Sequence, residues 1–517
     1  MRTSLFALTA LMGLALTACE EDSFETGDEA NITSSVCTVK DQRTGKTMTP
    51  AALAELNDPI AKKVFATGTC PKTFEEVMGK LRETDAKSCK GERAGIKTRL
   101  ISERSQQLGV PDAYRAVVSR ACDGRGEHEL LFSLFGIGFD GTEPPSELPE
   151  DVEIIAFDRE RGVFSYYTVE SGKWTHFGNS KDYIEPDAGK KLRCASCHTS
   201  GGLIMKELNQ PWVHWEGKME TPGTTALVDQ FPAFGTKATG YNLEPTIKKG
   251  NAAWNTAKIA HLTSNRKPAD VLRPLFCSVQ VNIQTTGSNK LPTAVPTDFL
   301  FDPSLGRKDT LPITAADYTA LLVSNNQRMT DDGGNSLVGK DGAELVDNVF
   351  RFAFPERSGE DVDYVSQLIT AGIIDADFVK DVLMVDFTRP VFSDARCELL
   401  SFAPTTATTP ATFRSGFVSK LEAKKPAAGT PAAALLANLK DTADSSKHDS
   451  AMATFVSSCK ARPKKDLLKD VFTIASARRN RVRERPIMEF AESLPFDDLA
   501  PNKLSALDAV TCTLTTK

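Results

Sequence analysis

Eleven cysteines are distributed over the 517 residues, and their spacing divides them into three groups. Cys194 and Cys197 lie three positions apart with His198 directly after them, and Cys19 follows an apolar segment near the N-terminus. The other eight show no such local pattern: Cys37, Cys70, Cys89, Cys122, Cys277, Cys397, Cys459 and Cys512. Four of these precede the Cys194–His198 motif and four follow it. Because an even set of cysteines in an exported chain indicates disulfides, we expect each four to pair among themselves, in an order that the spacing leaves open; free buried thiols at some of these positions are the alternative.

Residues 1–18 have the layout of a secretory signal. Met1 and Arg2 give a basic start, and Leu5–Ala18 is an apolar stretch that ends in small residues. The stretch is shorter than the ~20 apolar residues of a membrane-spanning helix. Cys19 follows Leu-Thr-Ala and resembles the lipid-bearing cysteine of bacterial lipoproteins; an ordinary signal peptide with a coincidental cysteine is the alternative. We therefore predict export, with lipid anchoring through Cys19 on the periplasmic or cell-surface side of a bacterial membrane.

The Cys194-Ala-Ser-Cys197-His198 motif indicates covalent attachment of one c-type haem. The spacing of the two cysteines places both thiols on one side of a helical turn, where they can add to the two vinyl groups of the porphyrin. His198 then offers an axial nitrogen to the iron. A structural zinc site would need a fourth ligand, and a disulfide-exchange site would need a thioredoxin-like context; neither is visible in the sequence.

The segment after the motif resembles a family of bacterial cytochrome c-like lipoproteins and exported proteins. It reads Gly201-Gly-Leu-Ile-Met205-Lys-Glu-Leu-Asn-Gln-Pro211-Trp212-Val-His214-Trp215, and Trp174–Gly178 before the motif also resembles that family. The resemblance covers about residues 150–225 and implies haem binding and redox chemistry, without a defined reaction.

The sequence leaves the distal ligand of the iron open. Met205, His214 and Met219 are candidates by their proximity to the motif, and each could instead be a core or loop residue. A second strong ligand favours electron transfer, whereas an open position favours binding of small gases or peroxide. Apolar lining of the haem pocket is predicted for four further residues: Leu203, Pro211, Trp212 and Trp215.

Periodicity predicts a mostly α-helical, multidomain fold with a small antiparallel β-meander before the haem motif. The meander is expected from Val152–Phe157, Val163–Val169 and Trp174–Phe177, three β-branched and aromatic runs separated by turns. Thr98–Leu108 is expected to be helical. The expected organisation is a signal peptide at 1–18, an acidic tether at 19–35, a helical domain at 36–125, a cytochrome c-like haem domain at 126–270 and an α-rich domain at 271–517, with an Ala/Thr/Pro-rich, partly extended excursion at 403–440.

Together these features predict a membrane-anchored monohaem cytochrome that exchanges single electrons with a redox partner protein. A haem enzyme or a gas- or peroxide-binding protein is the alternative, and a haem-stabilised structural or sensory lipoprotein is the third. No catalytic residue is assigned. The net charge of −6 predicts no nucleic-acid partner. A basic run is predicted to form a solvated helix face, or else a docking patch for an acidic partner: Arg478, Arg479, Arg481, Arg483 and Arg485.

Overall fold

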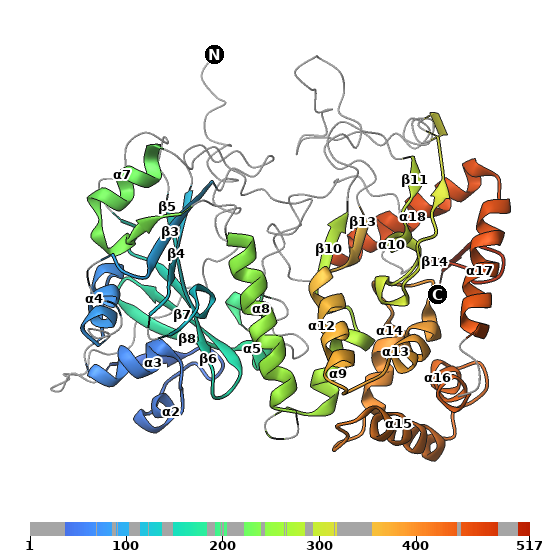
Figure 1. Ribbon diagram of the computed structural model, residues 1–517, viewed down its shortest axis with the longest axis horizontal. Coiled ribbons are helices and arrows are strands. Elements are labelled where there is room, and N and C mark those ends of the chain that lie inside the picture. The colour runs from blue at the N-terminus through green and yellow to red at the C-terminus, as the bar shows by residue number, and fades with distance from the viewer. Residues whose placement is uncertain are drawn as a thin grey trace, which may run out of the picture.

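The computed structural model shows two lobes, one built on a β-sheet and one mainly helical (Figure 1). It describes residues 37–68, 70–84, 89, 91, 93–102, 114–122, 124–136, 148–183, 192–196, 198, 201–203, 222–238, 243–262, 264, 266–284, 293–314, 316–317, 354–441, 446–483 and 505–516. No described helix is long and apolar enough to cross a membrane.

A nine-stranded mixed sheet forms the first lobe, in the order β2-β1-β8-β7-β6-β5-β4-β3-β9. The six strands from β3 to β8 are consecutive and antiparallel, whereas β1 pairs in parallel with β8, and β3 with β9. The strands are β1 (Val39–Asp41), β2 (Lys46–Thr47), β3 (Ile96–Ser102), β4 (Tyr114–Arg120), β5 (Leu130–Gly136), β6 (Val152–Asp158), β7 (Val163–Glu170), β8 (Lys173–Asn179) and β9 (Thr236–Lys237).

The predicted fold class is therefore wrong, although the predicted meander exists. The three predicted runs form β6, β7 and β8, but they are the middle of a large sheet. The expected helix at Thr98–Leu108 is wrong as far as it is described, because β3 runs through Ser102. Ile96 and Leu100 are both buried. Residues four apart share a face in a strand as well as in a helix, so this spacing could not distinguish the two structures.

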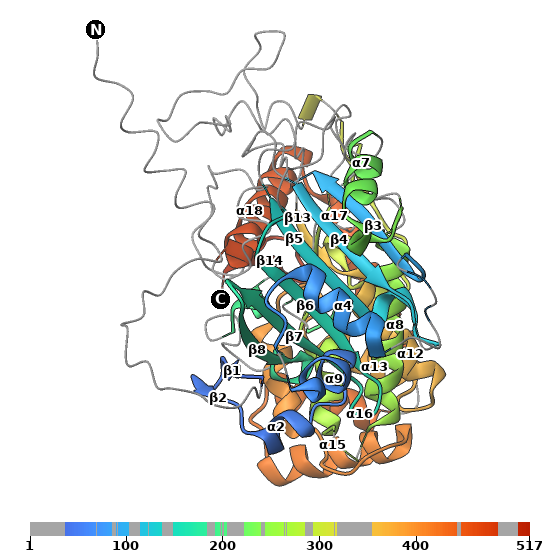
Figure 2. The ribbon, with the colours of Figure 1, turned by 90° about the vertical axis from the view of Figure 1, so that its left-hand side faces the viewer.

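Helices cover both faces of the sheet. One face packs against α2 (Pro50–Ala54), α3 (Pro59–Lys63), α4 (Phe74–Thr84) and α7 (Pro222–Gln230). Figure 2 looks onto this face, with α4 lying across the strands. The other face packs against α5 (Ser180–Tyr183), the short 3-10 turn η4 (Arg193–Ser196) and the long helix α8 (Leu243–Ala260). Because both faces are covered, Val163–Val169 of β7 is continuously buried.

The second lobe contains two apolar cores among helices and short two-stranded sheets. Its two-stranded sheets pair β10 (Val281–Gln284) with β13 (Phe354–Arg357), β11 (Ala294–Val295) with β12 (Leu311–Pro312), and β14 (Ser505–Leu507) with β15 (Leu514–Thr516). Its helices are α9 (Pro268–Phe276), α10 (Thr297–Leu300), α12 (Gly359–Thr370), α13 (Ala376–Leu383), α14 (Asp394–Glu398), α15 (Pro410–Lys424), α16 (Pro431–Lys440), α17 (Ser446–Ala461) and α18 (Lys464–Arg483).

The segment 403–440 is not the partly extended excursion that its composition predicts. It contains α15 and α16, which pack against each other. Pro410 and Pro431 occupy the first turn of their helices, and Thr409 and Thr430 cap them by accepting backbone N–H groups. Proline lacks only an N–H that the first turn leaves unused, so this pattern starts a helix.

The arginine run also differs from its predicted solvated face. Arg478 and Arg479 of α18 are buried, and Arg478 donates to the Phe299 carbonyl at 3.0 Å. The Arg478 guanidinium lies 4.3 Å from the centre of the Phe299 ring. Burial, followed by the positive charge of Arg389, lowers the pKa of Arg478 to about 9. The first two arginines of the run therefore belong to the core of the second lobe.

Four disulfides join the eight cysteines other than Cys19, Cys194 and Cys197. As expected, each disulfide joins two cysteines on the same side of the Cys194–His198 motif. The pairs are Cys37–Cys70, Cys89–Cys122, Cys277–Cys397 and Cys459–Cys512. The first two lie in the sheet lobe and the last two in the helical lobe.

A buried histidine makes the stability of the sheet lobe dependent on pH. His176 of β8 is 1% exposed, and neither ring nitrogen has a hydrogen-bond partner among the described residues. Burial, followed by the nearby positive charge of Arg43, lowers the pKa of His176 to about 4. In the unfolded chain a histidine titrates near ~6.5. Between these values the unfolded state binds the extra proton, so acid favours unfolding.

We expect the free energy of unfolding to fall by roughly 3 kcal/mol as the pH drops from about 6.5 to about 4, from this group alone. Urea denaturation at several pH values measures the effect. His176→Phe should flatten the slope in this range, whereas Thr175→Val, at a half-buried position of the same strand that does not titrate, should leave it unchanged. Equal slopes for His176→Phe and the parent protein would contradict the assignment.

Candidate haem site

A cavity of about 120 Å³ lies between the second face of the sheet and α8. Alternate residues of neighbouring strands line it, because side chains alternate between the faces of a strand. Leu243 and Ile247, one helical turn apart on α8, line it as well. The strand residues that line it include Val117 of β4, Leu131 and Ser133 of β5, Ile155 of β6 and Tyr166 of β7. The walls are thus mainly apolar.

The Cys194–His198 motif contributes a single turn to this cavity. The His198 amide donates to the Cys194 carbonyl at 2.9 Å, the bond that closes one turn of an α-helix. The side chains of Cys194 and His198 both line the cavity. Cys194 takes part in none of the four disulfides. Cys197 lies outside the described residues, so its role stays a prediction.

The His198 ring is oriented by a backbone carbonyl. Its Nδ1 lies 3.1 Å from the Gly202 oxygen. Because a carbonyl oxygen can only accept, this hydrogen bond requires the proton on Nδ1 and leaves the lone pair on Nε2. Metal-binding histidines characteristically donate their second ring nitrogen in this way, which fixes the tautomer and the direction of the coordinating nitrogen.

Tyr166 holds the turn that orients His198. Its hydroxyl donates to the carbonyls of Gly201 and Gly202, each at 2.9 Å. Burial, followed by the charge of Cys194, raises the pKa of Tyr166 well above its usual value, so the hydroxyl keeps its proton. The Tyr166 ring stacks on Tyr183 with a 4.5 Å centroid separation. The Tyr166 hydroxyl therefore positions the Gly202 carbonyl, which accepts the hydrogen bond from His198.

Two glycines allow neighbouring segments to pack closely at the turn that follows the motif. Gly201 has a φ of +74°, and a Cβ there would collide with the backbone of Ser180. On α8, a Cβ at Gly250 would collide with the Leu203 side chain. Asn251 follows, and its side-chain oxygen accepts the Leu203 amide at 2.9 Å. The turn is thereby fixed between α5 and α8.

Charged groups at the cavity come in pairs. Arg193 pairs with Glu170 at 2.5 Å, and Arg115 pairs with Glu153 at 3.5 Å. Arg115, Glu153 and Arg193 line the cavity. Guanidinium groups bind carboxylates well, so these two arginines could hold the acidic substituents of a porphyrin.

The structure brings together three of the predicted site residues, Cys194, His198 and Leu203, and Leu203 is buried. The other predicted residues lie outside the described residues: Cys19, Cys197, Met205, Pro211, Trp212, His214, Trp215 and Met219. The distal ligand therefore remains a prediction. Sequence reasoning missed the contributions of the sheet and α8. The alternation within Val152–Asp158 marks Ile155 as facing one side, but only the strand order shows which side carries the motif.

No protein-family model, curated protein or solved structure matches this chain. The resemblance of residues 150–225 to exported cytochrome c-like proteins therefore stays a prediction that rests on those residues. Within the described part of the chain, no group of three or more His, Cys, Asp or Glu side chains could hold a metal ion.

Proposed function

We propose that this chain is an exported monohaem c-type cytochrome, anchored through Cys19, which exchanges single electrons with a partner protein. The observation that carries the proposal is the arrangement of Cys194 and His198. Both side chains line one mainly apolar cavity, and the Gly202 carbonyl selects the His198 tautomer whose Nε2 can coordinate iron. In this proposal Cys194 and Cys197 form the thioethers and His198 is the proximal ligand.

When bound, a haem supplies one-electron chemistry at its iron, with a potential set by the axial ligands and the surroundings. The residues around the cavity would bind and orient this haem. Tyr166 fixes the Gly201–Gly202 turn and thereby the His198 ring. Val117, Leu131, Ile155 and the α8 side chains exclude water from the site.

Production of the full chain in a bacterium with c-type cytochrome maturation tests the proposal. We expect one covalently bound haem per chain, detected by haem staining after denaturing electrophoresis and by intact mass. We also expect a reversible one-electron reduction in a potentiometric titration. Absence of covalent haem, where a control cytochrome c is matured in the same cells, would contradict the proposal.

The spectrum of the ferric protein separates electron transfer from the alternative. A low-spin ferric spectrum that cyanide leaves unchanged, and a ferrous spectrum that carbon monoxide leaves unchanged, are expected if Met205, His214 or Met219 provides the second ligand. A high-spin ferric spectrum that shifts with cyanide, or a ferrous spectrum that shifts with carbon monoxide, would reject simple electron transfer and favour the haem enzyme or gas-binding protein.

A further inference from the structure

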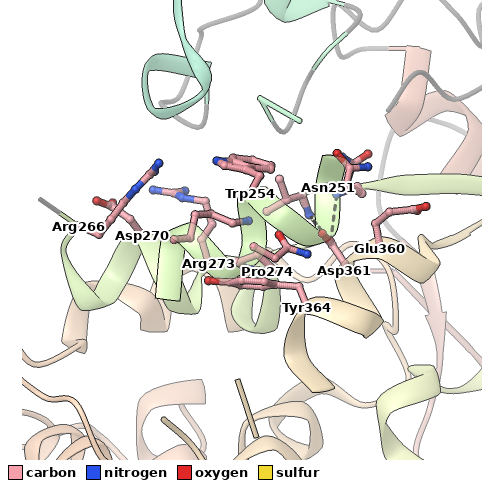
Figure 3. Close-up of a pocket in the computed structure, with 13 residues that line it drawn as sticks. Asn251, Trp254, Arg266, Asp270, Arg273, Pro274, Glu360, Asp361 and Tyr364 are labelled. Atoms are coloured by element: carbon pink, nitrogen blue, oxygen red, sulfur yellow. Dashed lines mark hydrogen bonds between the residues drawn. The ribbon is translucent and has the colours of Figure 1, made fainter. Parts of the chain in front are cut away.

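A second, smaller pocket lies where the two lobes meet, between α8, α9 and α12 (Figure 3). Its volume is about 30 Å³, room for about two water molecules or one small polyatomic group. Figure 3 shows Trp254 of α8 and Tyr364 of α12 on opposite sides, with Asp270 and Arg273 of α9 on one flank.

Lys258 lies between these two aromatic rings. Its Nζ is 3.7 Å from the Trp254 ring centre and 4.0 Å from that of Tyr364. The residue is only 9% exposed, and no described carboxylate lies within ion-pair distance of its ammonium group. Burial, followed by the positive charge of Arg266, lowers the pKa of Lys258 well below its usual value. The pocket thus contains a buried amine that forms no ion pair with a described carboxylate, although the negative charge of Asp361 acts to raise its pKa.

Four further donors around this pocket lack acceptors among the described residues. Asn251 uses its side-chain oxygen to accept from Leu203, which leaves its amide nitrogen as a donor. Among the described residues, that nitrogen, the Trp254 indole nitrogen, the Arg273 Nε and the Tyr364 hydroxyl are buried without a partner. Buried polar groups are normally satisfied, so four such groups around one pocket indicate that something else occupies it.

The carboxylates that line the pocket, Asp270, Glu360 and Asp361, already accept hydrogen bonds, and Glu360 accepts from the Ser358 hydroxyl. Asp361 accepts the backbone amides of Val279 and Gln280 at 2.9 and 3.0 Å. Asp270 accepts the Lys267 amide at 3.4 Å, at the start of α9. Because these carboxylates already accept hydrogen bonds while the donors remain, an acceptor, and beside Lys258 an anionic one, would satisfy the pocket.

We propose that this pocket binds a small carboxylate, of formate or acetate size, between Lys258 and the donors of Asn251, Trp254 and Arg273. Two carboxylate oxygens match several divergent donors better than a single spherical anion does. The proposal does not depend on haem binding. Asn251 also contacts the turn after the motif through Leu203, so the pocket lies directly behind the candidate haem site.

Thermal unfolding and titration calorimetry of the full-length chain with sodium acetate test this inference. A ligand that binds the folded state alone raises the unfolding temperature as its concentration rises. We expect acetate to raise it more than chloride does at equal ionic strength. Lys258→Met should weaken acetate binding by roughly tenfold or more, because it removes a charge-assisted hydrogen bond.

Lys249→Met is the matched control, since Lys249 is an exposed lysine on the same helix, and it should bind acetate like the parent protein. Trp254→Phe keeps an aromatic face beside Lys258 but removes one donor, and it should bind more weakly than the parent. Circular dichroism establishes that each variant folds. Acetate that acts no more strongly than chloride would overturn the proposal, as would unchanged binding by Lys258→Met.

Discussion

Replacing Cys194 and Cys197 together by serine is expected to abolish covalent haem attachment completely. A serine hydroxyl cannot form the thioether, and the eight other cysteines beyond Cys19 are consumed in four disulfides. His198 and the apolar cavity remain in this variant, so residual haem should be dissociable. Haem staining after denaturing electrophoresis should therefore show no band, while the chain itself is still produced.

The matched control is Cys277→Ser with Cys397→Ser, which also removes two sulfur atoms. It opens a disulfide in the helical lobe, remote in sequence from the motif. This variant should lose stability by roughly 2–5 kcal/mol yet keep its covalent haem. A haem band that survives in the Cys194/Cys197 variant would exclude the motif as the attachment site.

The sequence predicted local features of this molecule well. The meander of β6, β7 and β8 was recognisable because its runs are β-branched and aromatic and are separated by turns such as Arg161-Gly162. The grouping of the disulfides followed from counting cysteines on each side of the motif. In both cases the information lies within a short stretch or in a simple count.

The full sheet could not be predicted in this way. Its outer pairings connect distant segments, such as Val39 of β1 with Trp174 of β8, and Lys97 of β3 with Thr236 of β9. No local periodicity encodes a parallel pairing across such distances. In β3, moreover, the spacing of Ile96 and Leu100 suits a helix as well as a strand.

The candidate site shows the same division. The sequence motif identified Cys194 and His198 directly. Tyr166, however, gains its role only when the fold places its hydroxyl against the Gly201 and Gly202 carbonyls. For Arg478 the expectation from the sequence was wrong. An arginine-rich helix is usually solvated, but here the core of the second lobe surrounds that side chain.

Arg357→Met is expected to destabilise the helical lobe by roughly 3–5 kcal/mol. Arg357 of β13 forms a buried ion pair with Asp302 and donates to the Pro274 carbonyl of α9; the two charged side chains are 1% and 2% exposed. Asp302 also accepts the Ser304 amide at 2.9 Å. Methionine would fill much of the volume but leave the Asp302 charge buried without its partner. The midpoint of urea denaturation measures the loss.

Two further variants separate the buried charge from a general effect of losing a cation. Lys447 pairs with Asp441 at 2.7 Å, but the side chains are 38% and 44% exposed, so Lys447→Met should cost no more than about 1 kcal/mol. Adding Asp302→Asn to Arg357→Met removes the stranded charge, and the double variant should be less destabilised than the sum of the single variants. If the effects of the two substitutions simply add, Arg357 and Asp302 stabilise the lobe independently. The main contribution of Arg357 would then be its hydrogen bond to the Pro274 carbonyl, which joins β13 to α9.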